Sequence, residues 1–270
     1  MTVERTTQGQ GQDSVSGMIQ AILRENSVLS AVFSDVSQFA SPGDKSISFP
    51  RNTNRFQVQK LTGAQKGDDQ ELIIDLDKLE LSEEAHIQWV IKKFDQARSK
   101  QSILENAIEN ATGEHAIQLD EDIIKELIPN ITNANITGGI TQDNIVDTIT
   151  AANQARIPRS NRRWVFGNAA YGELLKIDGF VDASKSNLDI VRVGQIGTLY
   201  GVPVFESDVM EPGQGLLTHR DALAFGFGSG PAVESESVIK YGTGSRRWVM
   251  DQLYGLKTLN GGKMAVRLVP

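Results

Sequence analysis

The run Val193-Gly194-Gln195-Ile196-Gly197-Thr198-Leu199-Tyr200-Gly201-Val202-Pro203-Val204 says more about the fold of this 270-residue chain than any other stretch. Strand-like runs lie at both of its ends, at Ile190–Val193 and Val202–Phe205. Upstream, Arg163–Phe166 is a third short apolar run, and Asn168 is placed to cap a short helix after it. Strands and helices are therefore mixed without a regular strand–helix–strand rhythm, which indicates an α+β protein.

The longest helical pattern covers residues 95–128. Its apolar stripe consists of Leu104, Ile108, Leu119, Ile123 and Leu127. Gly113 interrupts the pattern, but the stripe resumes in near phase beyond it. We therefore expect one continuous helix that ends at Pro129.

Residues 41–81 follow a different pattern, because apolar and polar residues alternate over short runs. These runs lie at 47–49, 56–58 and 72–76, and turn signals separate them. The pattern predicts a long two-stranded ribbon with one weakly apolar face. Such a ribbon is marginal in isolation and needs a surface to lie on, which is a first indication of assembly.

Other segments give weaker signals. A helix is expected from Ser14 onward, and another one is expected to carry Ile145 and Ile149 and to stop at Pro158. The remaining predicted strands are 223–227, 233–241 and 264–269.

Composition excludes several classes of protein. The chain has no cysteine, so it has no disulfide and no thiolate metal site. Its N-terminus lacks the apolar core of a secretory signal, and no window is apolar enough for a membrane helix. The net charge of −7 does not attract nucleic acid by itself, so we expect any DNA beside this protein to be enclosed and not gripped.

No motif for catalysis, cofactor binding or metal binding is found. His86, His115 and His219 each stand alone, so we expect them to be hydrogen-bonded or exposed and not metal ligands. The glycine-rich runs 226–230 and 242–247 match no phosphate-binding or nucleophile motif, so we expect them to form turns between strands. The acidic run 120–122 is expected to be a solvated helix face.

Charge is unevenly spread along the chain. Residues 43–67 carry a net charge of +4, whereas residues 95–128 carry −5. A basic ribbon and an acidic long helix are complementary. The predicted contact residues between subunits are therefore Arg51, Arg55, Lys60, Lys66, Glu105, Glu109, Asp120 and Glu121.

The stretch 163–207 resembles the major capsid proteins of tailed bacteriophages of the Hong Kong 97 type. The resemblance rests on Arg163-Trp164-Val165-Phe166-Gly167-Asn168-Ala169-Ala170-Tyr171-Gly172-Glu173, on Phe180-Val181-Asp182-Ala183, and above all on the run that ends at Val204. It implies an N-terminal arm at 1–13, a helical region at 14–40 and an extended loop at 41–81. It also implies a peripheral domain at 82–129 and 223–270, with a long spine helix and antiparallel strands, and an axial domain at 130–222.

The same resemblance implies a structural protein and not an enzyme. Its subunits would assemble into hexamers and pentamers and close an icosahedral head around double-stranded DNA, first in the host cytoplasm and then in the virion. Because the chain starts with only a short arm, a separate scaffolding protein is expected, with a portal and a cement protein as further candidate partners and no membrane. Two alternatives are an encapsulin-type shell of a cellular compartment and an unassigned soluble enzyme domain.

Overall fold

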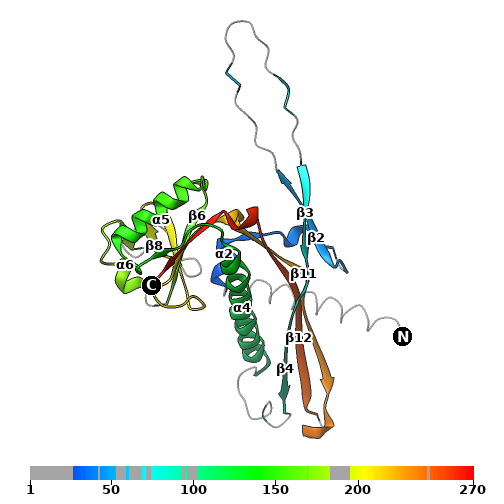
Figure 1. The fold of residues 1–270 in the computed structure, drawn as a ribbon. Helices are drawn as coiled ribbons and strands as arrows, with labels where there is room; N and C mark the ends of the chain where they lie inside the picture. The colour runs from blue at the N-terminus through cyan, green and yellow to red at the C-terminus, as the bar shows by residue number, and fades with distance from the viewer. Residues whose placement is uncertain are drawn as a thin grey trace.

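The computed structural model describes residues 27–41, 43–52, 59–60, 68–70, 74–92, 95, 103–168, 170–182, 195–241 and 244–270. In them a seven-stranded sheet with helices lies beside a long helix and a four-stranded sheet, and a ribbon projects beyond both (Figure 1). The predictions for residues 1–26, 56–58 and 190–193 lie outside the described residues.

The seven-stranded sheet has the order β5-β13-β10-β6-β9-β8-β7. Its strands are β5 (Ile136–Thr137), β6 (Arg162–Gly167), β7 (Phe180–Asp182), β8 (Gln195–Leu199), β9 (Val202–Ser207), β10 (Gly215–His219) and β13 (Ala265–Val269). Helices α5 (Gln142–Gln154) and α6 (Ala170–Leu174) pack on this sheet. In the core between the helices and the sheet, Trp164 stacks on Phe166 with ring centroids 5.3 Å apart. The strands expected at 163–166 and 202–205 are confirmed.

The most informative sequence run forms the β8–β9 hairpin. Tyr200 and Gly201 have φ of 50° and 76°, and they connect Leu199 to its partner Val202. Two successive residues with positive φ suit a tight hairpin turn, which Gly favours. A Cβ on Gly197 would lie 2.5 Å from the Val181 carbonyl oxygen of β7. Close approach at Gly197 and positive φ at Gly201 therefore favour glycine at these two positions.

The four-stranded sheet has the order β1-β11-β12-β4. Its strands are β1 (Ser34–Asp35), β4 (Glu83–Ile91), β11 (Leu223–Ser237) and β12 (Arg246–Thr258). The sequence analysis predicted neither β4 nor β12, although apolar and polar residues alternate over most of β4.

The turn predicted at 226–230 is wrong, because these residues lie inside β11. The register between β11 and β12 shifts between Phe227 and Ser229 and again before Ala232, so the strand bulges there. Gly226 and Gly228 serve close packing, since added Cβ atoms would lie 2.6 Å from Ile47 and 2.4 Å from Leu81. The second glycine-rich run does contain a turn residue, Gly244, with φ of 88°.

Helix α4 (Ile103–Asn130) runs without a break through Gly113, as predicted for this part of the chain. It does not end at Pro129, which lies in its last turn. The Asn130 side-chain amide donates to the Glu126 carbonyl at 2.7 Å and supports that turn. Helix α5 was expected to stop at Pro158, but it ends at Gln154. Arg156, two residues later, has a left-handed φ of 55°, which a continuing helix does not allow.

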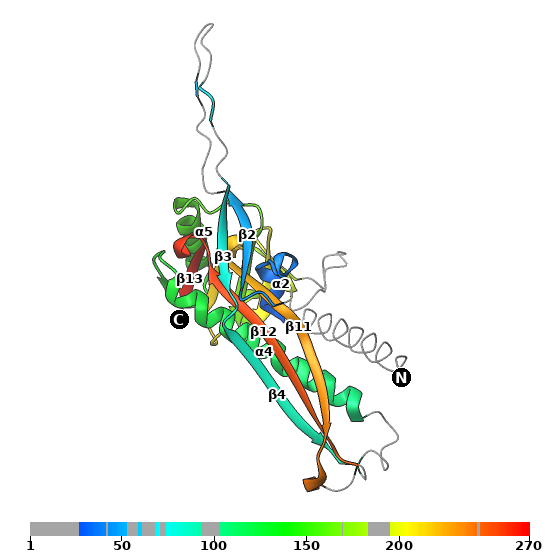
Figure 2. The same cartoon turned by 90° about the vertical axis from the view of Figure 1, so that its right-hand side faces the viewer.

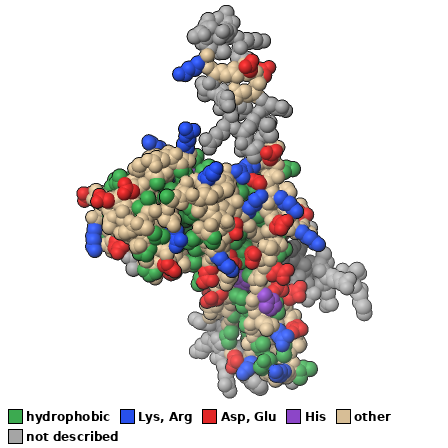
Figure 3. All heavy atoms as spheres, viewed as in Figure 1, with side chains coloured by type: hydrophobic (Ala, Val, Ile, Leu, Met, Phe, Trp, Pro, Cys, Tyr) green, Lys and Arg blue, Asp and Glu red, His purple; other side chains and the backbone are tan. Residues whose placement is uncertain are grey.

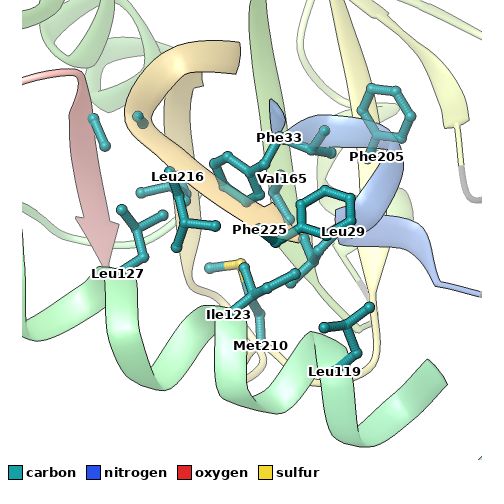
Figure 4. Packing of buried hydrophobic residues seen from close by; sticks show 14 of the residues in the cluster. Leu29, Phe33, Leu119, Ile123, Leu127, Val165, Phe205, Met210, Leu216 and Phe225 are labelled. Carbon is teal, nitrogen blue, oxygen red and sulfur yellow. The ribbon is translucent and has the colours of Figure 1, made fainter. Parts of the chain in front are cut away.

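The main hydrophobic core lies where α4 meets both sheets (Figure 4). Leu119, Ile123 and Leu127 of α4 contribute to it, together with buried side chains of the short helix α2 (Val28–Val32). Val165 and Leu216 enter from the seven-stranded sheet, and Phe225 and Phe227 enter from β11. This one cluster therefore joins the two sheets into one body.

The C-terminal strand lies in a different sheet from the one expected. Strand β13 pairs with β10 in the seven-stranded sheet, whereas residues 265–269 were expected beside the antiparallel strands of the peripheral domain. A short 3₁₀ turn, Asn260–Gly262, separates it from β12 and redirects the chain. Gly262 has φ of 70°, and a Cβ there would lie 1.6 Å from the Asn130 carbonyl oxygen.

The ribbon is two-stranded as predicted, with β2 (Ser46–Asn52) antiparallel to β3 (Ile74–Glu80) (Figure 2). Its base has a small core of its own, in which Ile47, Phe49 and Leu79 pack on Ala224 and Leu259. The ribbon is thus anchored on its own subunit and projects from there.

We predict that Gly113→Ala raises the free energy of unfolding by about 0.5–1 kcal/mol, since Ala is the better helix former. No atom lies within 4 Å of a Cβ added at Gly113, so no steric cost offsets the gain. Urea unfolding of unassembled subunits measures it. Gly255→Ala is the control and should destabilise, because its Cβ would lie 2.1 Å from the Glu80 carbonyl oxygen. A loss of stability in Gly113→Ala would contradict the prediction.

Candidate functional site: surfaces for subunit contact

The outer face of the ribbon is apolar toward its far end, beyond an exposed ion pair between Lys78 and Glu80. Ile47, Phe49 and Leu79 point into the subunit, so side chains at the intervening positions point away from it. On this outer face Pro50 lies opposite Leu76, and Ile74 lies two residues before Leu76 in β3. Leu76 is 71% exposed and Ile74 is 57% exposed. Two adjacent aliphatic side chains on a projecting strand form a surface suited to a partner.

The inner face of the ribbon is held by a polar cluster. Arg51 contacts Asp77 at 2.6 Å, and the Lys257 ammonium contacts the other oxygen of the same carboxylate at 3.0 Å. Arg51 also donates to the Asn260 side chain. Burial alone would raise the pKa of Asp77, but the bonds from Arg51 and Lys257 outweigh it and lower that pKa. The cluster fixes the ribbon to its own subunit.

The predicted contact residues are placed as follows. Glu105, Glu109 and Glu121 are exposed on α4, and Lys60 is exposed in the loop. Arg51 is engaged within its own subunit, and its contact with a neighbour stays a prediction. Arg55 and Lys66 lie outside the described residues.

Asp120 corrects the prediction of a solvated acidic face. It is only 4% exposed, so it cannot reach a neighbouring subunit. Its carboxylate accepts hydrogen bonds from the Ser27 hydroxyl at 2.5 Å and from the backbone N–H groups of Val28 and Leu29 at 3.0 and 3.2 Å. These N–H groups begin α2 and lack partners within that helix. A side chain of α4 thus caps a helix 91 to 93 residues away in sequence.

Burial raises the pKa of the Asp120 carboxyl to about 6, against the opposing effect of its three hydrogen bonds. The sequence signal for the start of α2 was available, since Ser27 is a good N-cap residue and accepts from the Ser30 N–H at 3.1 Å. No local pattern connects it to Asp120.

A groove of about 450 Å³ lies between α4 and the edge strand β4, and Tyr254 of β12 also lines it. His86 pairs with Asp251 across the strands, and the Tyr254 hydroxyl donates to Asp122 at 2.5 Å. His115 is buried and hydrogen-bonded to the backbone of Met250, in agreement with the expectation that it is hydrogen-bonded or exposed. It is 3% exposed, and its Nε2 has no hydrogen-bond partner within the described parts of the chain.

Burial lowers the pKa of His115, which keeps the imidazole neutral near pH 7. The described residues contain no group of three or more His, Asp or Glu side chains that could hold a metal ion. Among the described helices, none is long and apolar enough to cross a membrane.

Comparison with solved structures identifies the fold. The capsid of Ralstonia phage GP4 matches with a TM-score of 0.67 at 13% identity, over 90% of this chain and 87% of that one. The capsid of a native GTA particle matches with a TM-score of 0.63 at 12% identity, over 91% and 90% of the two chains. A structure from Mycobacterium phage Che8 has 19% identity and a TM-score of 0.59, over 83% and 84%.

No protein-family model matches the chain, and no curated protein matches it either. The structural matches nevertheless cover most of both chains, so the chain has the phage capsid fold. The predicted α+β class and the Hong Kong 97-like fold are confirmed.

Asp120 gives a prediction for the pH dependence of stability. Its pKa rises from 3.8 to about 6 on folding, so the folded state holds the proton more tightly than the unfolded chain does. The stabilisation is full below about pH 4 and is lost as the pH rises to about 6, a change of roughly 3 kcal/mol. Asp120→Asn should remove this dependence.

Urea unfolding of wild type and Asp120→Asn at a series of pH values tests it. Relative to Asp120→Asn, the wild type should become more stable as the pH falls from about 6 to about 4. A difference independent of pH would show that Asp120 ionises normally. Glu121→Gln, at the exposed neighbouring position, is the matched control.

Proposed function

We propose that this chain is the major capsid protein of a tailed bacteriophage, a structural subunit and not an enzyme. Its copies form hexamers and pentamers that close an icosahedral head around double-stranded DNA, first in the host cytoplasm and then as the virion shell. The observation that carries the proposal is the phage capsid fold over about nine tenths of the chain. A separate scaffolding protein, a portal and a cement protein are proposed as partners.

Domain assignment follows the two sheets. We propose 41–81 as the extended loop, and 82–129 with 223–264 as the peripheral domain built on α4 and the four-stranded sheet. The axial domain is 130–222 with 265–270, which includes the returning strand β13.

The apolar outer face of the ribbon is proposed as the main contact with a second copy of the chain. Fully burying one aliphatic side chain contributes about 1.5–3 kcal/mol. Leu76 and Ile74 are exposed in the single subunit, so their burial is available to assembly. The polar cluster around Asp77 holds the ribbon at a fixed angle, which lowers the ordering cost of this contact.

Charge complementarity is proposed as a second, weaker contribution. The basic loop residues Arg55, Lys60 and Lys66 face acidic residues of α4 in a neighbouring subunit, namely Glu105, Glu109 and Glu121. Each exposed pair contributes about 0–1 kcal/mol, yet every subunit of a shell repeats it. Asp120 has no part in this contact, because it is buried.

Ile74→Ser with Leu76→Ser should abolish shell formation while the melting temperature of the unassembled subunit stays nearly unchanged. Both side chains are exposed in the subunit, so only the contact loses their burial. Negative-stain microscopy and light scattering, with scaffolding protein co-expressed, give the result. Val146→Ser, at an exposed apolar position of α5, is the control and should still form shells. Wild-type shells from the double variant would remove the ribbon face from the contact.

Lys60→Glu with Lys66→Glu should slow assembly at low salt, and Glu109→Lys with Glu121→Lys should do the same. Combining all four substitutions should restore the rate, since the charges are exchanged. High salt should reduce the differences, because it screens exposed charges. Light-scattering kinetics measure the rates. If the fourfold variant shows the sum of the two rate defects, the loop lysines and the α4 glutamates do not contact each other.

A further inference from the structure

Four arginines lie at one end of the seven-stranded sheet, where Arg162 and Arg163 project to opposite faces, and we call this end the arginine edge (Arg159, Arg162, Arg163 and Arg220). Arg162 and Arg163 open β6, and Arg220 directly follows β10, the neighbouring antiparallel strand. Arg159 lies in the short loop between α5 and β6. The strand register places His219 opposite Arg162, so the end of β10 and the start of β6 coincide.

The two less exposed arginines hold the local backbone in place. Arg162 donates from Nε to the Pro158 carbonyl at 3.0 Å and from Nη2 to the Ile157 carbonyl. Arg163 donates to the Ala31 carbonyl at the end of α2. Both guanidinium groups are thus fixed by neutral carbonyl oxygens, and their positive charges are retained.

The exposed arginines are carried by the same braced loop. The Arg220 N–H donates to the Asn161 carbonyl at 3.1 Å, which joins the end of β10 to the loop that carries Arg159. Arg159 and Arg220 are both exposed. Their side chains are therefore presented on a rigid backbone, with their guanidinium groups at the surface.

The positive charge of the arginine edge is not neutralised. None of the four arginines pairs with a carboxylate within the described parts of the chain. Burial lowers the pKa of Arg162 and of Arg163, and repulsion from Arg159 and from Arg220 respectively lowers them further.

Two acids lie near the edge. Asp221 lies 3.7 Å from His219 Nδ1, and Asp35 and Asp221 line the same hollow as Arg220. Two carboxylates do not balance four guanidinium groups, so the edge remains a local exception in a chain whose net charge is −7.

We propose that the arginine edge binds the phosphodiester backbone of nucleic acid, without regard to base sequence, through Arg159 and Arg220. Guanidinium groups bind phosphate oxygens in bidentate fashion. The identification of the ligand as nucleic acid rests on the proposed function, since a phage shell encloses DNA. At this one surface it departs from the expectation that DNA is enclosed and not gripped.

The surroundings favour nucleic acid over an acidic protein surface. Besides the arginines, the loop exposes Pro158, Ser160 and Asn161, and it offers no cluster of large apolar side chains. Protein–protein contacts usually have an apolar, aromatic-rich centre, whereas contacts with nucleic acid are polar and positively charged.

The test measures binding of a short fluorescent duplex of mixed sequence to unassembled subunits over a range of salt concentrations. Each phosphate contact contributes about 0.9 to the slope of log affinity against log salt. Arg159→Gln with Arg220→Gln should therefore make that negative slope shallower by about 1.8. The matched control, Lys240→Gln with Arg246→Gln at the end of the β11–β12 hairpin, changes net charge equally and should leave the slope unchanged.

The outcomes separate this inference from the proposed function, because shell formation is scored independently by microscopy. Equal loss of slope in both double variants, or no salt-dependent binding by the wild type, overturns the inference. Loss of shells in the Arg159 and Arg220 double variant with unchanged DNA binding also overturns it, and would assign the edge to an acidic protein surface. Failure of the wild type to form shells would count against the proposed function alone.

Discussion

The rest of the structure depends on the burial of one hydrophobic cluster where α4 meets both sheets (Figure 4). Leu119, Ile123 and Leu127 are fully buried in this cluster, and side chains of both sheets enter it. Because α4 crosses this junction, its amphipathic stripe sets the relation between the two halves of the subunit. Helix α2 completes the cluster, and Asp120 ties its first turn to α4.

A buried carboxylate without a cationic partner is costly, and Asp120 is tolerated because three donors face it. The N-terminus of a short helix supplies two of them, where partial positive charge gathers. The arrangement binds the segment that begins at Ser27 to the long helix. It places the start of the described chain at the centre of the subunit and not at its edge.

Polar and apolar surfaces are divided in a way that suits assembly. On the ribbon, charge faces the subunit at Arg51 and Asp77, while Ile74 and Leu76 face outward. On the face that Figure 3 shows, hydrophobic, basic and acidic side chains of the described residues are interspersed. Exposed aliphatic side chains of this kind are unfavourable for an isolated monomer and favourable for a subunit whose neighbours cover them.

The sequence by itself determined the α+β class, the long helix through Gly113 and the ribbon, because each depends on local periodicity. It predicted β9 but neither β8 nor the β8–β9 hairpin. It could not assign β13 to its sheet, since strand pairing joins residues far apart in the chain. Nor could it tell Asp120 from its exposed neighbour Glu121. The packing of α2 onto α4 buries Asp120 and leaves Glu121 in water. The pairing of β6 with β10 brings the arginines of the arginine edge to one end of the sheet.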